Sequence, residues 1–146
     1  MLNIGTILYL NPFHFKNGAT PKNKYFIILK SVDSKIIIAS LPTSICKAPS
    51  LINHSHGCNH DPERCFNCFA FEAGKVVCTN GFAFPLPTFM YGNEVEEYEI
   101  DKLNFDHKIE GVDYEIKGQL TESDSLEILN CLKQSASIRR GVKKHL

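Results

Sequence analysis

Runs of apolar residues in the first third of the chain alternate with short polar stretches. Three such runs cover residues 4–10, 24–30 and 35–41, and each is rich in β-branched or aromatic side chains. These runs are too short for ordinary helices, so the pattern predicts three β-strands. Only the tetrapeptide at 31–34 separates the last two runs, which predicts a hairpin. Residues 11–23 contain two prolines and a glycine, so we expect a surface loop there.

The middle of the chain continues the strand pattern. An Ala-Gly pair at 73–74 and an Asn-Gly pair at 80–81 are turn signals that suit short strands joined by tight turns. Further on, Val112, Tyr114 and Ile116 alternate with charged residues. Because alternate residues of a strand share a face, we expect these three side chains to point to the core.

The period of the pattern changes near the end of the chain. Apolar side chains recur there at helical spacing, at Leu126, Ile128, Leu129 and Leu132. Thr121 and Ser123 are candidate N-caps, and the acidic residues that follow each of them suit the positive end of a helix dipole. We therefore predict one C-terminal helix around 123–137. No internal repeat or linker divides the sequence, so we expect a single domain over residues 1–146.

Composition and charge argue against two classes of protein, those that coat double-stranded nucleic acid and those that span a membrane. The chain has 146 residues, of which 43% are hydrophobic, and 16 basic side chains balance 16 acidic ones. A protein that coats double-stranded nucleic acid would carry a basic excess, although a local cleft for a few phosphates needs none. We see no signal peptide, and no apolar run approaches the roughly 20 residues of a membrane span. We expect a cytoplasmic protein that binds no membrane and whose six cysteines are thiols or metal ligands.

The densest candidate chemistry lies in a Cys/His-rich insertion around 54–68. Its pattern is C-x-H-x4-C-x2-C, formed by Cys58, His60, Cys65 and Cys68. Thiolates and imidazoles are good zinc ligands, and zinc takes four of them tetrahedrally. His54 or His56 could replace His60, because residues two apart share one side of an extended segment. Four protein ligands leave no position open for water, so the pattern predicts a structural zinc.

Two other interpretations of this stretch stay open. The first is a polar loop with reduced cysteines, because the C-x-H gap is tighter than usual and no second knuckle follows. The second is a nucleophilic cysteine, which would need a histidine and an orienting third group close in space.

The order of motifs in the first half resembles the PemK/MazF-like family of toxin endoribonucleases. The similar parts are GTILYLNPF from Gly5, then a loop, KYFIIL from Lys24 and IIIASLPTS from Ile36; GFAFPLPTFMYG and the terminal helix follow in the same order. The resemblance implies a mainly β, α+β fold: an SH3-like PemK/MazF-type small β-barrel with a C-terminal helix. The Cys/His-rich insertion is not typical of that family.

The resemblance also implies a site for RNA cleavage. The family's arginine at the start of the second strand corresponds to Lys24, and its threonine after the third strand corresponds to Thr43. Ser44 and His14 are the further candidates for contact with the substrate. In the family these groups act without a metal on single-stranded RNA, whose 2′-hydroxyl attacks the adjacent phosphate while the 5′-oxygen leaves.

Elementary chemistry fits those roles. A preorganised cation and a hydroxyl donor stabilise the charge that develops on the phosphoryl oxygens. Lys24 keeps the charge of arginine but lacks its planar fork, which grips a phosphate with two parallel hydrogen bonds. Tyr25 stands where the family has proline.

Three functions follow from these observations. The first is a PemK/MazF-like toxin that acts as a metal-independent endoribonuclease on single-stranded RNA, with a structural zinc in the inserted loop. The second is a catalytically reduced barrel that binds RNA or a partner protein. The third is a zinc-stapled adaptor with no nucleic-acid role. The resemblance further implies an antitoxin protein and a second copy of the chain as possible partners.

Overall fold

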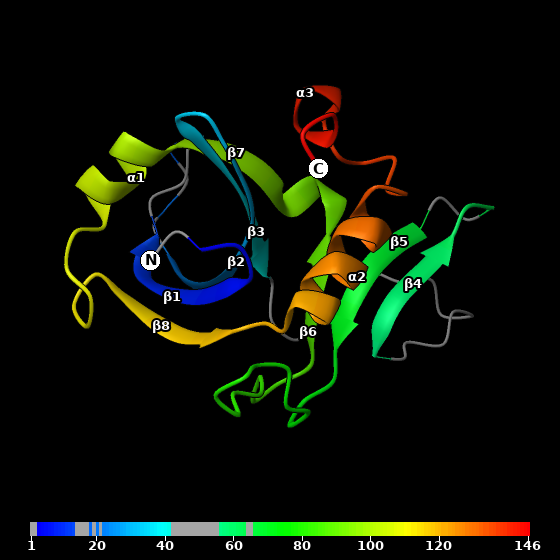
Figure 1. Cartoon of the computed structure of the whole chain (residues 1–146), viewed down its shortest axis with the longest axis horizontal. Coiled ribbons are helices and arrows are strands. Elements are labelled where there is room, and N and C mark those ends of the chain that lie inside the picture. Colours follow the sequence, from blue (N-terminus) through cyan, green and yellow to red (C-terminus); the bar gives the residue numbers. More distant parts are fainter. Residues whose placement is uncertain (1–2, 14–17, 19, 21, 42–55, 64–65) are drawn as a thin grey trace.

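Two antiparallel β-sheets and a few short helices make up the computed structural model of the protein (Figure 1). The structure describes residues 3–13, 18, 20, 22–41, 56–63 and 66–146. The first sheet has five strands in the order β7-β3-β2-β1-β8. Their bounds are Val95–Glu99 (β7), Lys35–Leu41 (β3), Lys22–Val32 (β2), Thr6–Phe13 (β1) and Tyr114–Gln119 (β8).

The second sheet has three strands in the order β4-β5-β6. Its strands are Gly57–Asp61 (β4), Phe66–Phe71 (β5) and Thr88–Tyr91 (β6). The described helices are Ile100–Asp106 (α1), Glu122–Leu132 (α2), Arg140–Lys143 (α3) and a short 3-10 helix, Gly92–Glu94 (η1). None of the helices within the described residues is long and apolar enough to cross a membrane.

The central strands of the five-stranded sheet are buried on both faces. Ile27 points to the side shared with α2, whereas Phe26 and Ile28 point to the side that Leu103 of α1 covers. Burial on two faces explains why these strands appear in the sequence as continuous apolar runs rather than as alternating ones. The β2–β3 pairing confirms the predicted hairpin, and its turn uses a left-handed residue, Asp33.

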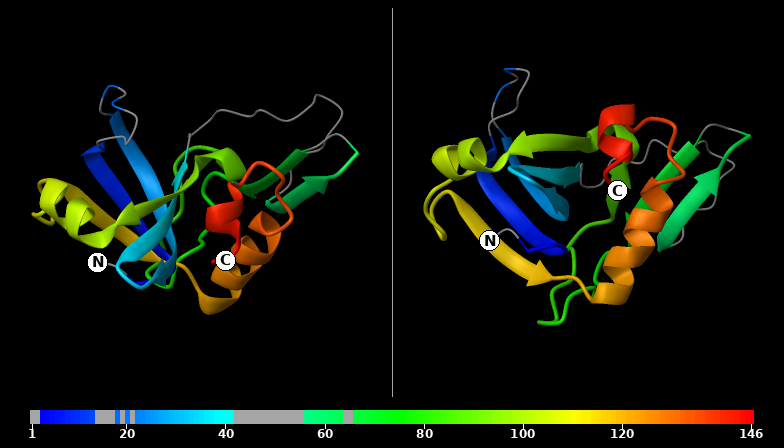
Figure 2. Two further views of the ribbon diagram at one scale, coloured as in Figure 1. Left: turned by 90° about the horizontal axis from the view of Figure 1, so that it is seen from above. Right: turned by 45° about the horizontal axis from the view of Figure 1, so that its top comes forward.

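Helix α2 joins the two sheets through one hydrophobic core. Its buried Ile128 and Leu132 belong to the same cluster as Phe69 and Phe71 of β5 and Ile27 of β2. Both views in Figure 2 place α2 beside the second sheet, and the packing of α2 against β4 and β5 agrees. The face of the first sheet that is turned toward α2 is therefore part of one continuous hydrophobic core.

The α+β, mainly β class predicted from the sequence is confirmed, but the sheets do not form a closed barrel. The five-stranded sheet curls in Figure 1, yet within the described residues its outer strands, β7 and β8, are not paired with each other. The predicted start of the C-terminal helix is also confirmed. Thr121 is its N-cap, and its hydroxyl accepts a hydrogen bond from the backbone N–H of Asp124 at 3.2 Å.

The predicted end of that helix is wrong, because α2 stops at Leu132 rather than near residue 137. Ser135 is buried, and its hydroxyl lies 2.9 Å from that of Ser137 and accepts the Ser137 backbone N–H at 3.3 Å. Serine side chains that bond locally to the backbone compete with helix continuation. Leu126, expected in the buried stripe, is 57% exposed.

Two expectations for the region before α2 are also wrong. Val112 and Ile116 are exposed rather than buried. Val112 lies in the turn before β8, and Ile116 lies on β8 itself, which is an outer strand of the sheet. The sequence pattern gave no indication of helix α1, which follows directly on β7.

Candidate functional site

A cluster of half-buried aromatic rings with one lysine lies on the face of the five-stranded sheet that shares its core with α2. We call it the aromatic–lysine surface and define it as Tyr9, Tyr25, Phe82 and Lys117. The Tyr9 and Tyr25 ring centroids are 4.9 Å apart, and Tyr25 lies 6.1 Å from Phe82. The Lys117 ammonium group stands 5.7 Å from the centre of the Tyr9 ring. The geometry combines stacking partners and a cation in one place.

Strand pairing fixes the two tyrosines. Tyr9 of β1 is directly opposite Tyr25 of β2, and opposed residues of an antiparallel pair share a face. Beneath them, the fully buried ring of Phe84 meets Tyr25 edge-on at 5.2 Å. Tyr25 and Phe82 pack against the core, and all three rings, including that of Tyr9, are only partly buried.

A tight turn brings Phe82 to the tyrosines. The Asn80 side chain accepts a hydrogen bond from the Phe82 N–H at 3.3 Å and donates one to the Lys117 carbonyl oxygen at 3.0 Å. Gly118 permits this close approach, because a Cβ atom there would lie 2.7 Å from both Asn80 Oδ1 and Cys78 Sγ. A glycine inside a strand often marks such a contact between two backbone segments.

The charge of the aromatic–lysine surface is largely balanced. Lys117 forms an ion pair with Glu115, and the hydrogen bond between them raises the pKa of Lys117. The ammonium group therefore stays protonated, but the carboxylate beside it offsets its charge. We expect the surface to bind flat, weakly charged groups rather than a concentrated anion.

The residue predicted to act on phosphate, Lys24, lies on the other face of the sheet. It is half-buried, pairs with Leu10 across the β1–β2 ladder, and alternates with Tyr25 along β2. Its strand position is close to the end of β3, because the adjacent Tyr25 pairs with Leu41, the last residue of that strand. The other substrate candidates, Thr43, Ser44 and His14, lie outside the described residues.

The zinc site predicted for the Cys/His-rich insertion is wrong, because its candidate ligands lie on different faces of the second sheet. Cys68 pairs with Asn59, and paired residues share a face. Cys58 and His60 flank Asn59 and therefore point to the opposite face. Cys65 lies outside the described residues, and among those that are described no group of three His, Cys, Asp or Glu side chains could hold a metal ion.

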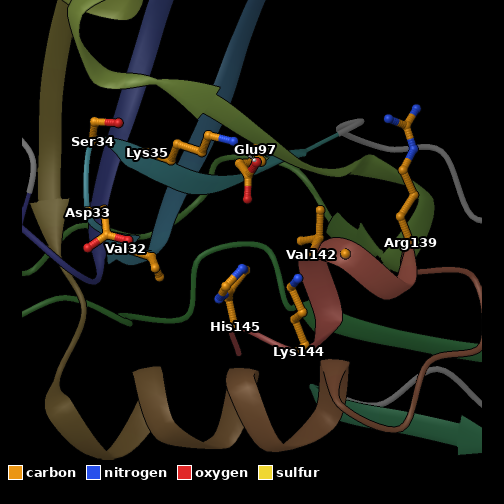
Figure 3. Close-up of a pocket in the computed structure, with 10 residues that line it drawn as sticks. Val32, Asp33, Ser34, Lys35, Glu97, Arg139, Val142, Lys144 and His145 are labelled. Atoms are coloured by element: carbon orange, nitrogen blue, oxygen red, sulfur yellow. Dashed lines mark ion pairs between the residues drawn. The ribbon is translucent and has the colours of Figure 1, made fainter.

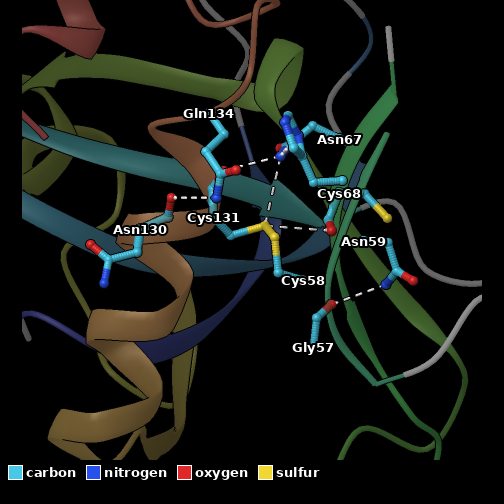
Figure 4. Close-up of a disulfide and its surroundings, with 9 residues drawn as sticks. Gly57, Cys58, Asn59, Asn67, Cys68, Asn130, Cys131 and Gln134 are labelled. Carbon is cyan, nitrogen blue, oxygen red and sulfur yellow. Dashed lines mark hydrogen bonds between the residues drawn. A yellow bond between two sulfur atoms is a disulfide. The ribbon is translucent and has the colours of Figure 1, made fainter. Parts of the chain in front are cut away.

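Cys58 instead forms a disulfide with Cys131 of α2, 73 residues away in the sequence (Figure 4). The expectation that the cysteines are thiols or metal ligands is therefore wrong for these two. A sulfur atom held in a disulfide is not available as a thiolate ligand. Of the substitute ligands, His56 accepts a hydrogen bond from the Glu72 N–H at 3.1 Å, and His54 lies outside the described residues.

An open groove of about 560 Å³ lies between the β2–β3 turn and the end of the chain (Figure 3). Three of its lining residues, Lys35, Lys144 and Arg139, are basic, and His145 stands among them. Lys35, however, is 3.1 Å from Glu97, and Arg139 is 3.8 Å from a carboxylate oxygen of β7. Acidic partners thus offset part of the groove's charge, so we do not place the candidate site here.

Comparison with known proteins finds no match: no protein-family model, no curated protein and no solved structure is significantly similar to this chain. The sequence pattern alone did not predict the aromatic–lysine surface as a site. Its signals were present, since an Asn-Gly turn precedes Phe82 and Gly118 interrupts a strand pattern. Strand register was needed to bring those signals together, because Tyr9 and Lys117 are more than a hundred residues apart.

Proposed function

We propose that the protein binds single-stranded RNA on the aromatic–lysine surface. The observation that carries this proposal is the row of accessible rings of Tyr9, Tyr25 and Phe82 with the Lys117 ammonium beside Tyr9. Unstacked bases bind by stacking on aromatic side chains, and a nearby cation adds attraction to the same rings. Bases inside a duplex are already stacked, so the surface favours single strands.

The balanced charge of the surface fits the composition of the whole chain. With 16 basic and 16 acidic side chains, affinity cannot come from a general basic excess. Binding through stacking releases few counterions, so affinity should fall only slightly as salt concentration rises. A protein that held the RNA by its phosphates would instead lose affinity steeply with salt.

We place the protein with PemK/MazF-like, SH3-like folds as part of this proposal. What supports it is the order of elements: three consecutive antiparallel strands, a smaller sheet, further strands of the first sheet and then a C-terminal helix. This order follows the motif order that the sequence shares with the family. In the described residues the first sheet is open and curled, so the proposed likeness rests on the order of the elements and not on a closed barrel.

RNA cleavage is a second candidate function, favoured by the position of Lys24. The register brings this lysine to the end of the sheet where β3 finishes at Leu41, two residues before Thr43. In that role Lys24 stabilises charge on the phosphate, Thr43 donates a hydrogen bond, and the RNA 2′-hydroxyl is the nucleophile. An antitoxin protein and a second copy of the chain are the partners that this function would involve.

Titration of a fluorescent single-stranded RNA, followed by anisotropy, tests binding. Tyr9→Ala should weaken binding by about tenfold, since loss of one stacked base costs on the order of 1–3 kcal/mol. Tyr9→Phe keeps the ring and should bind like the wild type. Phe105→Ala is the matched control, because Phe105 is 70% exposed but lies on α1, away from the surface. Equal affinities for all four proteins would contradict the proposal.

Cleavage is tested separately with end-labelled RNA in the presence of a chelator. If the protein is an endoribonuclease, Lys24→Ala should abolish cutting, and Thr43→Val should reduce it by about 10²–10³, the usual cost of one charge-stabilising donor. Lys24→Arg, which supplies a planar fork, should keep or raise the rate. If neither the wild type nor Lys24→Arg cuts the RNA, the cleavage hypothesis is wrong and RNA binding is the remaining proposal.

A further inference from the structure

A second candidate site lies at the end of the three-stranded sheet and shares no residue with the aromatic–lysine surface. It is a pocket of about 370 Å³ between the ends of β4, β5 and β6 and the segment that follows α2. We call it the Ser135 pocket, after the buried serine in its wall. Small-molecule sites have volumes of about 300–1,000 Å³, so this one suits a small ligand.

Neutral polar groups make up one part of the pocket's lining. They are the carboxamides of Asn67, Asn93 and Gln134 and the hydroxyls of Ser135 and Ser137. Among the described residues that line the pocket, His60 alone carries an imidazole, and none carries a carboxylate, lysine or arginine side chain. A charged ligand such as a phosphate would therefore lose its hydration without gaining an opposite charge.

Aromatic rings make up another part of the lining. Phe66 and Tyr91 are both more than nine-tenths buried, and their ring centroids are 6.5 Å apart with the planes steeply inclined. Apolar walls with a few converging polar groups are the usual composition of a ligand site. A wholly apolar ligand would offer no donor to Asn67 Oδ1, the buried oxygen of the lining that has no hydrogen-bond partner among the described residues.

Hydrogen bonds hold the polar groups in place before any ligand arrives. Asn67 Nδ2 donates to the Cys131 carbonyl oxygen at 3.0 Å and to His60 Nδ1 at 3.0 Å. The second contact leaves the proton of a neutral imidazole on Nε2, where it is a donor. On the other side of the pocket, the Lys143 ammonium donates to the Ser135 carbonyl oxygen at 2.9 Å.

One buried acceptor at the pocket has no partner in the described part of the chain. The two bonds made by Asn67 Nδ2 fix the orientation of the amide, and Asn67 Oδ1 is then buried with no hydrogen bond. Buried acceptors in folded proteins are nearly always paired, and an unpaired one costs about 1–3 kcal/mol. This unpaired oxygen belongs to a residue that lines the pocket, so a hydrogen-bond donor on a bound molecule is the partner that the site lacks.

The pocket also sits at a covalently fixed point of the fold. The Cys58–Cys131 disulfide ties β4 to α2, and Figure 4 shows both Asn67 and Gln134 near Cys131. The bond therefore restrains the end of α2, from which the Gln134–Ser137 wall of the pocket continues, against the sheet. A site that is already ordered loses little conformational entropy when a ligand binds.

We infer that the Ser135 pocket binds a neutral, planar heteroaromatic ring that carries both N–H donors and carbonyl or ring-nitrogen acceptors, as a nucleobase does. The ring packs on Phe66 or Tyr91, and its polar edge meets the carboxamides and hydroxyls. This inference does not rest on the proposed RNA binding, because none of the residues is shared. The ring could come from a free nucleoside or from a base of an RNA strand.

The experiment is a ¹H–¹⁵N NMR titration of the intact, oxidised protein. The probes are uridine, cytidine, adenosine and guanosine, with ribose alone as the negative probe. Side-chain NH₂ signals of Asn67, Asn93 and Gln134 should shift with at least one nucleoside and not with ribose. The combined variant Asn93→Ala with Gln134→Ala should weaken that binding at least tenfold. Its matched control removes two exposed carboxamides outside the pocket, Asn104→Ala with Asn130→Ala, and should bind normally.

A second arm identifies the source of the ring. A short single-stranded RNA that shifts the same side-chain signals, when its abasic counterpart does not, assigns the pocket to a base of an RNA strand. Shifts with nucleosides alone assign it to a free ligand. Tyr9→Ala should leave the nucleoside shifts intact, so failure of the proposed RNA-binding surface would not remove them. If no nucleoside and no RNA moves these side-chain signals, or if the double variant binds as well as its control, the inference is wrong.

Discussion

The five-stranded sheet and the unit formed by the second sheet with α2 are stabilised in different ways. In the first sheet, β1, β2 and β3 are neighbours in sequence and in space, and both faces are packed with apolar side chains. In the second unit, β4 and α2 are 60 residues or more apart in the sequence and meet through a disulfide and one face of the helix. The local apolar pattern is therefore sufficient to specify the strands of the first sheet. The second unit depends on one long-range contact, the disulfide between β4 and α2.

The two regions also carry the two candidate sites. The aromatic–lysine surface lies on the first sheet, while the Ser135 pocket lies between the second sheet and the segment after α2. Loss of the disulfide should therefore disturb the structure of the Ser135 pocket more than that of the aromatic–lysine surface.

Removal of the disulfide should have the largest effect. Cys58→Ala with Cys131→Ala should lower the free energy of unfolding by about 4 kcal/mol, because the bond closes a loop spanning 73 residues. Chemical denaturation with and without reductant measures this. The reductant should destabilise the wild type and leave the double variant unchanged. Equal stability of wild type and variant would show that the second unit does not depend on the bond.

A large-to-small substitution in the first sheet tests whether that sheet is stabilised by its own apolar packing. Ile28 is fully buried on the side covered by α1, so Ile28→Ala should cost about 3 kcal/mol. Denaturation curves give the value, and hydrogen exchange gives the location. The variant should lose amide protection in β1–β3, whereas the disulfide variant should lose it first in β4 and β5. Identical exchange patterns in the two variants would mean that the regions unfold as one unit.

A smaller effect is expected at the start of α2. Thr121→Ala removes the side-chain oxygen that accepts the Asp124 N–H and should cost about 1 kcal/mol. Thr121→Ser keeps that oxygen and should be nearly neutral. Thermal unfolding of the three proteins compares them, and a loss from serine as large as that from alanine would assign the effect to the methyl group instead.

A last effect, which appears only at alkaline pH, concerns Cys78, which lies under the turn that carries Phe82. Burial, with a smaller contribution from Asp124, raises the pKa of the Cys78 thiol to about 11. The unfolded chain loses this proton first as pH rises, so the stabilising contribution is complete below about pH 9 and falls between pH 9 and 11. The stability difference between wild type and Cys78→Ala should therefore shrink over that range. A constant difference would contradict the buried, neutral thiol.

The residues that could be predicted from sequence are those fixed by their neighbours. Strand β3 has the predicted bounds of 35 and 41, and Thr121 caps α2, because a short apolar run and a hydroxyl before a helix are local signals. The end of α2 at Leu132 was not predictable, since it depends on Ser135 becoming buried against distant residues.

The candidate sites depended still more on distant pairings. The metal-like spacing of Cys58 and Cys68 was misleading, because sheet register turns these residues to opposite faces and Cys131 provides the real partner. The aromatic–lysine surface also forms only when β8 pairs with β1 and brings Lys117 to Tyr9. Neither register nor a disulfide partner is recorded in the local pattern of residues.

The central claim is that the first sheet, and not the second unit, provides the primary surface for RNA. A single ¹H–¹⁵N titration of the wild-type protein with a single-stranded RNA tests it most directly. The backbone amides of Tyr9, Tyr25, Phe82 and Lys117 should show the largest shifts, and the shifts should persist when salt concentration is raised. Absence of shifts at these four positions, with or without shifts elsewhere, would contradict the account.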